Sequence, residues 1–112
     1  MYTYMATVTR VIDGDTFVAS VDLGFSVSME MTIRMAGIDA PEKGTPEGQA
    51  AANALRFLIM PDPVKIVTKK DRQEKFGRYL ADVYMFADMT EITVNEQMVK
   101  HGHAKFYDGG KR

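Results

Sequence analysis

Residues 4–23 read YMATVTRVIDGDTFVASVDL and contain two runs rich in β-branched and aromatic residues, Tyr4–Ile12 and Thr16–Leu23. Runs of this composition favour β-strands. Asp13 and Gly14 lie between them, and an Asp-Gly pair flanked by strand-forming residues is a strong signal for a β-hairpin. We therefore expect two antiparallel strands that are joined by a turn at Asp13-Gly14.

A third strand is expected directly after this hairpin. Apolar side chains occupy every second position from Met29 to Met35, and Glu30, Thr32 and Arg34 lie between them. This period of two is typical of a strand with one apolar face. The first 36 residues therefore predict a three-stranded meander.

A helix is expected to begin at Thr45-Pro46-Glu47, because threonine caps helices, proline suits the first helical position and glutamate favours the positive end of the helix dipole. Pro61 and Pro63 should end it. Two further strands and a short second helix are expected at Val64–Lys69, at Tyr79–Phe86 and from Thr93 to Gly102. This order predicts a single α+β domain over residues 1–112, mainly β. It is a five-stranded Greek-key barrel of the OB type, with a helix between strands 3 and 4 and a C-terminal helix.

The composition limits the chemistry available to a metal site. The chain has no cysteine and only two histidines, His101 and His103, so thiolate sites are excluded and a histidine-rich zinc site is disfavoured. We interpret both histidines as surface residues near a helix end. Any metal ion should therefore be bound by oxygen atoms.

The net charge and the hydropathy pattern do not identify a binding partner. The formal net charge is −1, which neither favours nor excludes nucleic acid, because a local basic patch is compatible with a neutral total. No apolar run approaches the ~20 residues that a membrane-spanning helix needs, and the first residues do not resemble a secretory signal. We expect a monomeric, cytoplasmic protein.

Four acidic residues flank two turns. Asp13 and Asp15 lie on either side of Gly14, and Asp39 and Glu42 lie on either side of Ala40-Pro41. Calcium prefers carboxylate and carbonyl oxygens, so Asp15, Asp39 and a nearby main-chain oxygen could form a calcium site. Taken singly, each acid is better explained as a turn or surface residue than as a metal ligand.

Two arginines are candidates for binding phosphate. Arg34 lies on the polar face of the third expected strand, and Arg78 lies at the entrance to the fifth. Guanidinium groups donate planar, bidentate hydrogen bonds that suit phosphate. The alternatives are a cross-strand ion pair for Arg34 and a solvated strand end for Arg78.

The segment from Lys65 to Arg78 is basic, with six basic and two acidic side chains and a net charge of +4. Contacts from such a segment to phosphates supply affinity without sequence preference. Phe76 and Tyr107 could stack on bases. A solvated basic loop would have the same composition.

Four blocks of the sequence resemble the signature blocks of staphylococcal-nuclease-like domains, in the same order and with comparable spacing. They are VIDGDT at residues 11–16, IRMAGIDAPE at 33–42, KFGRYL at 75–80 and VNEQMVKHGHA at 94–104. The resemblance covers residues 5 to 107. It implies a calcium-dependent nuclease that hydrolyses phosphodiester bonds of DNA or RNA and leaves 3′-phosphate ends.

The resemblance also implies a role for each matching residue. Asp15, Asp39 and the carbonyl of Ala40 would be the calcium ligands, and Glu42 would be the general base. Arg34 and Arg78 would hold the phosphate, with Asp13 as a supporting acid. Lys75, Phe76 and Tyr107 would border the nucleotide pocket.

The chain departs from the family pattern at its C-terminal end. Longer members continue into a third helix, so we expect a short version of the domain, and the adjacent Phe106 and Tyr107 alter an aromatic pair. One alternative is an OB-fold module that binds nucleic acid or peptide without cutting it. A calcium-binding regulatory domain is a weaker one, because the sequence lacks a helix-loop-helix calcium loop. The complete set of acids and arginines favours the nuclease.

Overall fold

The computed structural model describes residues 2–60, 62–69, 77–85 and 92–107. Five strands form a closed barrel in the order β1-β2-β3-β6-β5, with β3 and β6 parallel and the other neighbours antiparallel. The strands are β1 Tyr2–Asp13, β2 Thr16–Gly24, β3 Val27–Met35, β5 Val64–Thr68 and β6 Tyr79–Met85. The predicted meander and the mainly β, OB-type barrel are confirmed.

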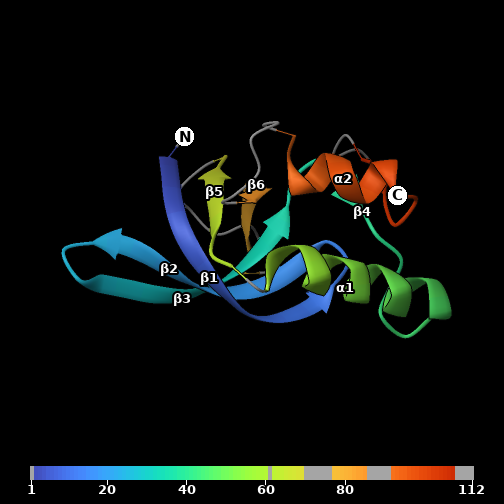
Figure 1. The fold of residues 1–112 in the computed structure, drawn as a ribbon, viewed down its shortest axis with the longest axis horizontal. Coiled ribbons are helices and arrows are strands. Elements are labelled where there is room, and N and C mark those ends of the chain that lie inside the picture. Colours follow the sequence, from blue (N-terminus) through green and yellow to red (C-terminus); the bar gives the residue numbers. More distant parts are fainter. Residues whose placement is uncertain (1, 61, 70–76, 86–91, 108–112) are drawn as a thin grey trace.

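Two helices lie on the outside of the barrel (Figure 1). α1 spans Pro46–Ile59, after the meander and before β5, and α2 spans Val94–Lys100. Both begin as expected from the sequence, because the Thr45 hydroxyl accepts the Gly48 N–H and the Thr93 hydroxyl accepts the Glu96 N–H. Neither helix in the described part of the chain is long and apolar enough to span a membrane.

A second, very short sheet was not predicted from the sequence. β4 Ile38–Asp39 pairs antiparallel with β7 Lys105–Phe106. Two-residue strands are too short to carry a periodic pattern, so only the folded chain reveals them. This sheet matters because one of its residues, Asp39, is a candidate site residue, and its partner is Lys105.

The core fills the barrel and the space beneath α1. Phe17, Ile33 and Ile66 are fully buried inside the barrel, and α1 buries Leu55 and Ile59. α1 packs along the end of β1 (Figure 1). This packing brings Ala51 of α1 against Gly14 in the β1–β2 turn, between Asp13 and Asp15.

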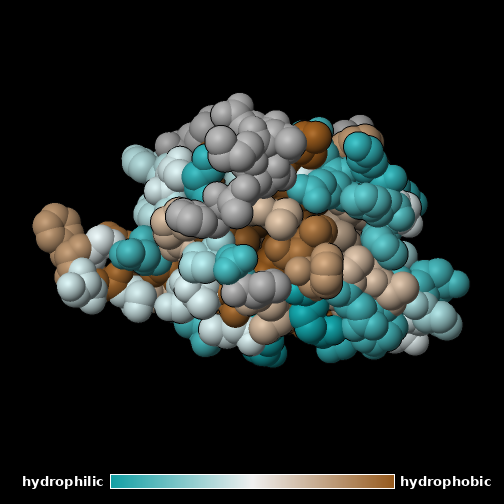
Figure 2. All heavy atoms as spheres, in the orientation of Figure 1, coloured by the Kyte–Doolittle hydropathy of each residue, from teal (hydrophilic) through white to brown (hydrophobic). Residues whose placement is uncertain are grey.

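The hairpin of β2 and β3 extends well beyond the barrel (Figure 1), because only Ile33–Met35 of β3 pair with β6. The predicted apolar face is therefore buried at Ile33 and Met35, while Met29 is 48% exposed. At the tip, Phe25 and Ser26 have φ values of 55° and 62°, which non-glycine residues rarely adopt. The end of the projecting hairpin is coloured as hydrophobic in Figure 2.

Candidate active site

Two of the candidate metal ligands converge on Arg34. Nη2 of Arg34 lies 3.5 Å from Oδ2 of Asp15 and 3.6 Å from Oδ1 of Asp39. Asp15 comes from the turn between β1 and β2, Arg34 from β3, and Asp39 from β4. Arg34 and Asp15 are both buried. Arg34 therefore forms ion pairs with neighbouring acids, as its alternative interpretation predicted, and its role in binding phosphate stays a prediction.

The Asp15 carboxylate is held by hydrogen bonds on both oxygens. Oδ1 accepts the Thr16 hydroxyl at 2.8 Å, and Oδ2 accepts the Ala40 N–H at 2.8 Å. Nη1 of Arg34 donates to the Met35 carbonyl at 2.7 Å. Both charged groups are therefore preorganised by their neighbours, as a catalytic or binding site requires.

The donors at this place suit a hard cation. Asp15 and Asp39 supply carboxylate oxygens, and Ala40 follows Asp39 directly and supplies a main-chain carbonyl. Within the described ranges, no group of three or more His, Cys, Asp or Glu side chains is arranged to hold a metal ion. A cation here would thus be bound by two carboxylates, main-chain oxygen and water, a set that calcium accepts.

Glu42 lies in the loop between β4 and α1, and its side chain is exposed. Its carbonyl accepts the Thr45 N–H at 3.2 Å and the Thr45 hydroxyl at 2.9 Å. A Cβ on Gly48, in the first turn of α1, would overlap this carbonyl. Glycine at position 48 therefore lets the Glu42 loop pack directly on the helix.

Asp13 supports the same loop. Its Oδ1 accepts the main-chain N–H of Lys43, the residue after Glu42, at 3.1 Å. Gly14 provides a second close approach, since a Cβ there would lie 2.6 Å from the Cβ of Ala51 in α1. A hydrogen bond and close packing thus fix the β1–β2 turn, the Glu42 loop and α1 relative to one another.

The remaining candidates are distributed less tightly. Arg78 is half-buried just before β6, two residues before Leu80, whose strand partner is Arg34. Tyr107 is half-buried, and its N–H donates to the Gly37 carbonyl at 2.8 Å, in the turn between β3 and β4. Lys75 and Phe76 lie outside the described residues.

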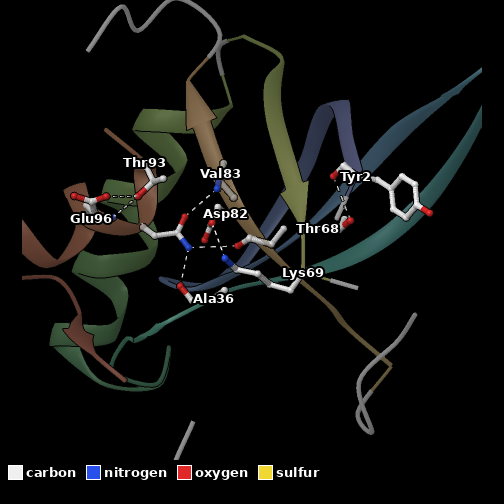
Figure 3. Close-up of polar contacts among 10 residues, drawn as sticks. Tyr2, Ala36, Thr68, Lys69, Asp82, Val83, Thr93 and Glu96 are labelled. Atoms are coloured by element: carbon white, nitrogen blue, oxygen red, sulfur yellow. Dashed lines mark hydrogen bonds and ion pairs between the residues drawn. The ribbon is translucent and has the colours of Figure 1, made fainter. Parts of the chain in front are cut away.

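A buried amide joins β6 to the residue that follows β3, the strand that contains Arg34. Asn95 of α2 accepts the Val83 N–H at 3.0 Å and donates to the Ala36 carbonyl at 2.8 Å and the Ala81 carbonyl at 3.3 Å (Figure 3). Ala36 follows β3, while Ala81 and Val83 belong to β6. The sequence indicated only a helix start here, because these partners are remote along the chain.

An open pocket of about 360 Å³ lies beside Asp39 and Ala40. The C-terminal segment contributes His103 and Lys105 to its lining. Both histidines were expected on the surface. His101 is exposed, whereas His103 is half-buried and lines this pocket. Neither His103 nor Lys105 was singled out from the sequence, because the β4–β7 pairing that brings them to Asp39 is not visible there.

The chain is similar to known proteins over most of its length. The family model described as "Staphylococcal nuclease homologue" matches residues 32–112. The chain is 44% identical over 79 residues to a probable staphylococcal-like nuclease, CAN3, of Oryza sativa subsp. japonica, a match that covers 68% of this chain and 19% of the rice protein. It is 32% identical over 108 residues to the thermonuclease of Staphylococcus hyicus, which covers 89% of this chain and 59% of that protein.

A third relative is the micrococcal nuclease of Shigella flexneri, 31% identical over 109 residues, a match that covers 93% of this chain and 59% of that protein. The chain thus spans less than two thirds of the length of each of these relatives. The matched family model covers β4, both helices, β5, β6, β7 and the end of β3. This chain belongs to the staphylococcal nuclease family.

Proposed function

We propose that this chain is a calcium-dependent nuclease that hydrolyses phosphodiester bonds of DNA or RNA with little sequence specificity. The observation that carries the proposal is the convergence of the Asp15 and Asp39 carboxylates on the Arg34 guanidinium. Opposite charges that are held together near a pocket provide binding groups for both a cation and a phosphate. The similarity to proteins named as nucleases in rice, Staphylococcus hyicus and Shigella flexneri supports the same activity.

Asp15, Asp39 and the carbonyl of Ala40 would hold the calcium ion. When bound, calcium would supply Lewis-acid stabilisation of the phosphate and a template for the attacking water. The hydrogen bond from the Ala40 N–H to Asp15 keeps these ligand-bearing residues together before any ion arrives. Such preorganisation lowers the entropic cost of binding the ion.

Glu42 would take the proton from the attacking water. Its side chain is exposed, so water and substrate have access to it, and the contacts of its main chain with Thr45 and Gly48 fix the loop. Arg34 and Arg78 would bind the phosphate and stabilise the charge that develops at phosphorus. Asp13 would act on the loop through its hydrogen bond to Lys43.

Lys75, Phe76 and Tyr107 would border the nucleotide, with a cation for phosphate and aromatic rings for the base. The monomeric state and the cytoplasmic location stay predictions from the sequence. The rival function, an OB-fold module that binds without cutting, makes no use of a calcium ion. Metal dependence therefore separates the two.

The test is calcium binding and cleavage by an Asp39→Asn variant, with Asp62→Asn as a control that removes an exposed acid away from the site. The amide keeps the size of the side chain and removes one ligand charge. We expect the calcium affinity to fall by more than the about 10–100-fold typical of outer-shell substitutions, and cleavage to fall with it. Equal calcium affinity in the two variants would show that Asp39 is not a calcium ligand. Cleavage in chelator would refute the calcium requirement.

A further inference from the structure

A groove between β1 and α1 contains three basic side chains, Arg10, Lys43 and Arg56, and its walls include Val11 and Met60. No acidic side chain from the described residues lines it. None of the three cations forms an ion pair with an acid in residues 2–60, 62–69, 77–85 and 92–107. The groove is therefore a concave, positively charged surface, which favours a polyanionic ligand.

A β-bulge gives Arg10 its position in the groove. Val8 pairs with Ala19 and Arg10 with Val18, so Thr9 is the extra residue, and its hydroxyl donates to the Val18 carbonyl at 3.1 Å. In a regular strand, Arg10 would share a face with the buried Val8. Because of the bulge, Thr9 and Arg10 are both exposed, while Val8 and Val11 are buried. Bulges commonly re-aim side chains in this way.

Arg56 is also held in place. It is half-buried on α1, and its Nη1 donates to Oδ1 of Asn53 at 2.6 Å. The same Asn53 oxygen accepts Nε2 of Gln49 at 3.1 Å. A guanidinium has five N–H donors, so this single bond leaves others that can reach a phosphate.

The groove reaches the candidate active site. Lys43 follows Glu42, and the Lys43 N–H is bonded to the Asp13 carboxylate, while Ile12 of the groove precedes Asp13. We infer that the groove binds the phosphate backbone of the nucleic acid strand beyond the nucleotide that is cut, with Arg10, Lys43 and Arg56 as phosphate contacts. This inference deepens the proposed nuclease function and rests on it for the identity of the polyanion.

The test is the affinity for fluorescein-labelled single-stranded DNA of 2 and about 20 nucleotides, measured by anisotropy in chelator at several salt concentrations. Arg10→Gln/Arg56→Gln and the single variant Arg56→Gln are compared with Lys100→Gln, which removes one charge, as Arg56→Gln does, but from an exposed residue of α2 outside the basic segment of residues 65–78. Each phosphate contact to single-stranded DNA contributes about 0.7 to the slope of log affinity against log salt. We expect Arg10→Gln/Arg56→Gln to lose about 1.4 and Arg56→Gln about 0.7 from this slope for the long strand, and both to lose far less for the dinucleotide.

Three outcomes would refute phosphate binding in the groove. They are an unchanged slope in the groove variants, an equal loss of slope in Lys100→Gln and Arg56→Gln, or an equal loss of slope for both strand lengths. The proposed function fails separately. If the wild type cleaves DNA in calcium but its binding is insensitive to Arg10 and Arg56, the nuclease stands and the groove is refuted. If the wild type never cleaves but long-strand binding depends on the two arginines, the groove stands as a nucleic-acid site and the nuclease is refuted.

Discussion

Gly48 lies so close to Glu42 that a Cβ atom on Gly48 would overlap the Glu42 carbonyl oxygen. The first turn of α1 therefore supports the loop that presents the proposed general base. The Thr45 hydroxyl completes the support, because it donates to the Glu42 carbonyl and accepts the Gly48 N–H. α1 therefore both packs on the barrel and supports the loop that contains Glu42.

Gly48→Ala should lower cleavage even though alanine favours helices over glycine by about 1 kcal/mol. The new methyl group must push the Glu42 loop away, and a displacement of about 1 Å can cost ~10²-fold in rate. Gly44→Ala is the matched control, since a Cβ there would meet nothing within 4 Å. Steady-state cleavage rates of both variants check this. Equal rates would show that the loop position does not matter to activity.

Arg34→Gln should destabilise the protein in the absence of calcium. The substitution leaves the buried Asp15 carboxylate next to Asp39 without a neutralising cation, and breaking a buried ion pair typically costs about 3–5 kcal/mol. Calcium should then stabilise this variant more than it stabilises the wild type, because it no longer binds beside a guanidinium. Urea unfolding with calcium and with chelator measures both effects.

Lys69→Gln is the control for that experiment. Lys69 forms a partly exposed ion pair with Asp82 at 2.8 Å. Pairs of this kind contribute about 0–1 kcal/mol. This pair does not include Asp15 or Asp39, the acids that contact Arg34. If calcium stabilised neither the wild type nor Arg34→Gln, the two carboxylates would not be metal ligands.

Asn95→Ala should cost about 1–3 kcal/mol of stability for the buried Val83 N–H that it leaves unsatisfied, and less for the half-buried Ala36 carbonyl. Asn95→Asp should cost more, because a carboxylate would face the Ala36 and Ala81 carbonyls to which the amide now donates. Chemical denaturation of the two variants ranks them. An aspartate variant as stable as the wild type would mean that the amide bridge is not needed.

Phe25→Asn/Ser26→Gly should stabilise the protein by about 1–2 kcal/mol. Both residues adopt positive φ, a conformation that costs most L-residues roughly this much and that Asn-Gly turns adopt readily. Phe25 is fully exposed, so its removal sacrifices no packing. Thermal and urea unfolding provide the readout, and a destabilised double variant would show that the tip is not strained.

The features predicted correctly from the sequence are those determined by neighbours in the chain. The first hairpin, the alternation in β3 and the cap at Thr45 each depend on a few adjacent residues. The structure has the strand alternation and the cap where they were expected, and the hairpin turn at Gly14-Asp15, one residue later than predicted. The barrel was predicted from the order of the expected strands and helices along the chain. Propensity and pattern act locally, so they suffice for this level of structure.

The contacts that build the site could not be predicted in the same way. The Ala40 N–H reaches Asp15 across 25 residues, and the Lys43 N–H reaches Asp13 across 30. The β-bulge at Thr9 reverses the side on which Arg10 is expected, and nothing in the local sequence announces it. The resemblance to the family indicated the candidate acids and arginines. The residues that hold the surrounding segments in place, such as Gly48 and Asn95, could be identified only from the fold.

Cleavage of a labelled single-stranded DNA, with calcium, with magnesium and with chelator, is the direct test of the proposed calcium-dependent nuclease activity. Wild type is compared with Glu42→Gln and with Glu47→Gln, which neutralises an exposed acid five residues away in the first turn of α1. We predict calcium-dependent cleavage that falls by about 10²–10⁴-fold in Glu42→Gln, the usual contribution of a general base, and that persists in Glu47→Gln. Cleavage at the wild-type rate by Glu42→Gln, or binding without cleavage by the wild type in every metal, would contradict the account.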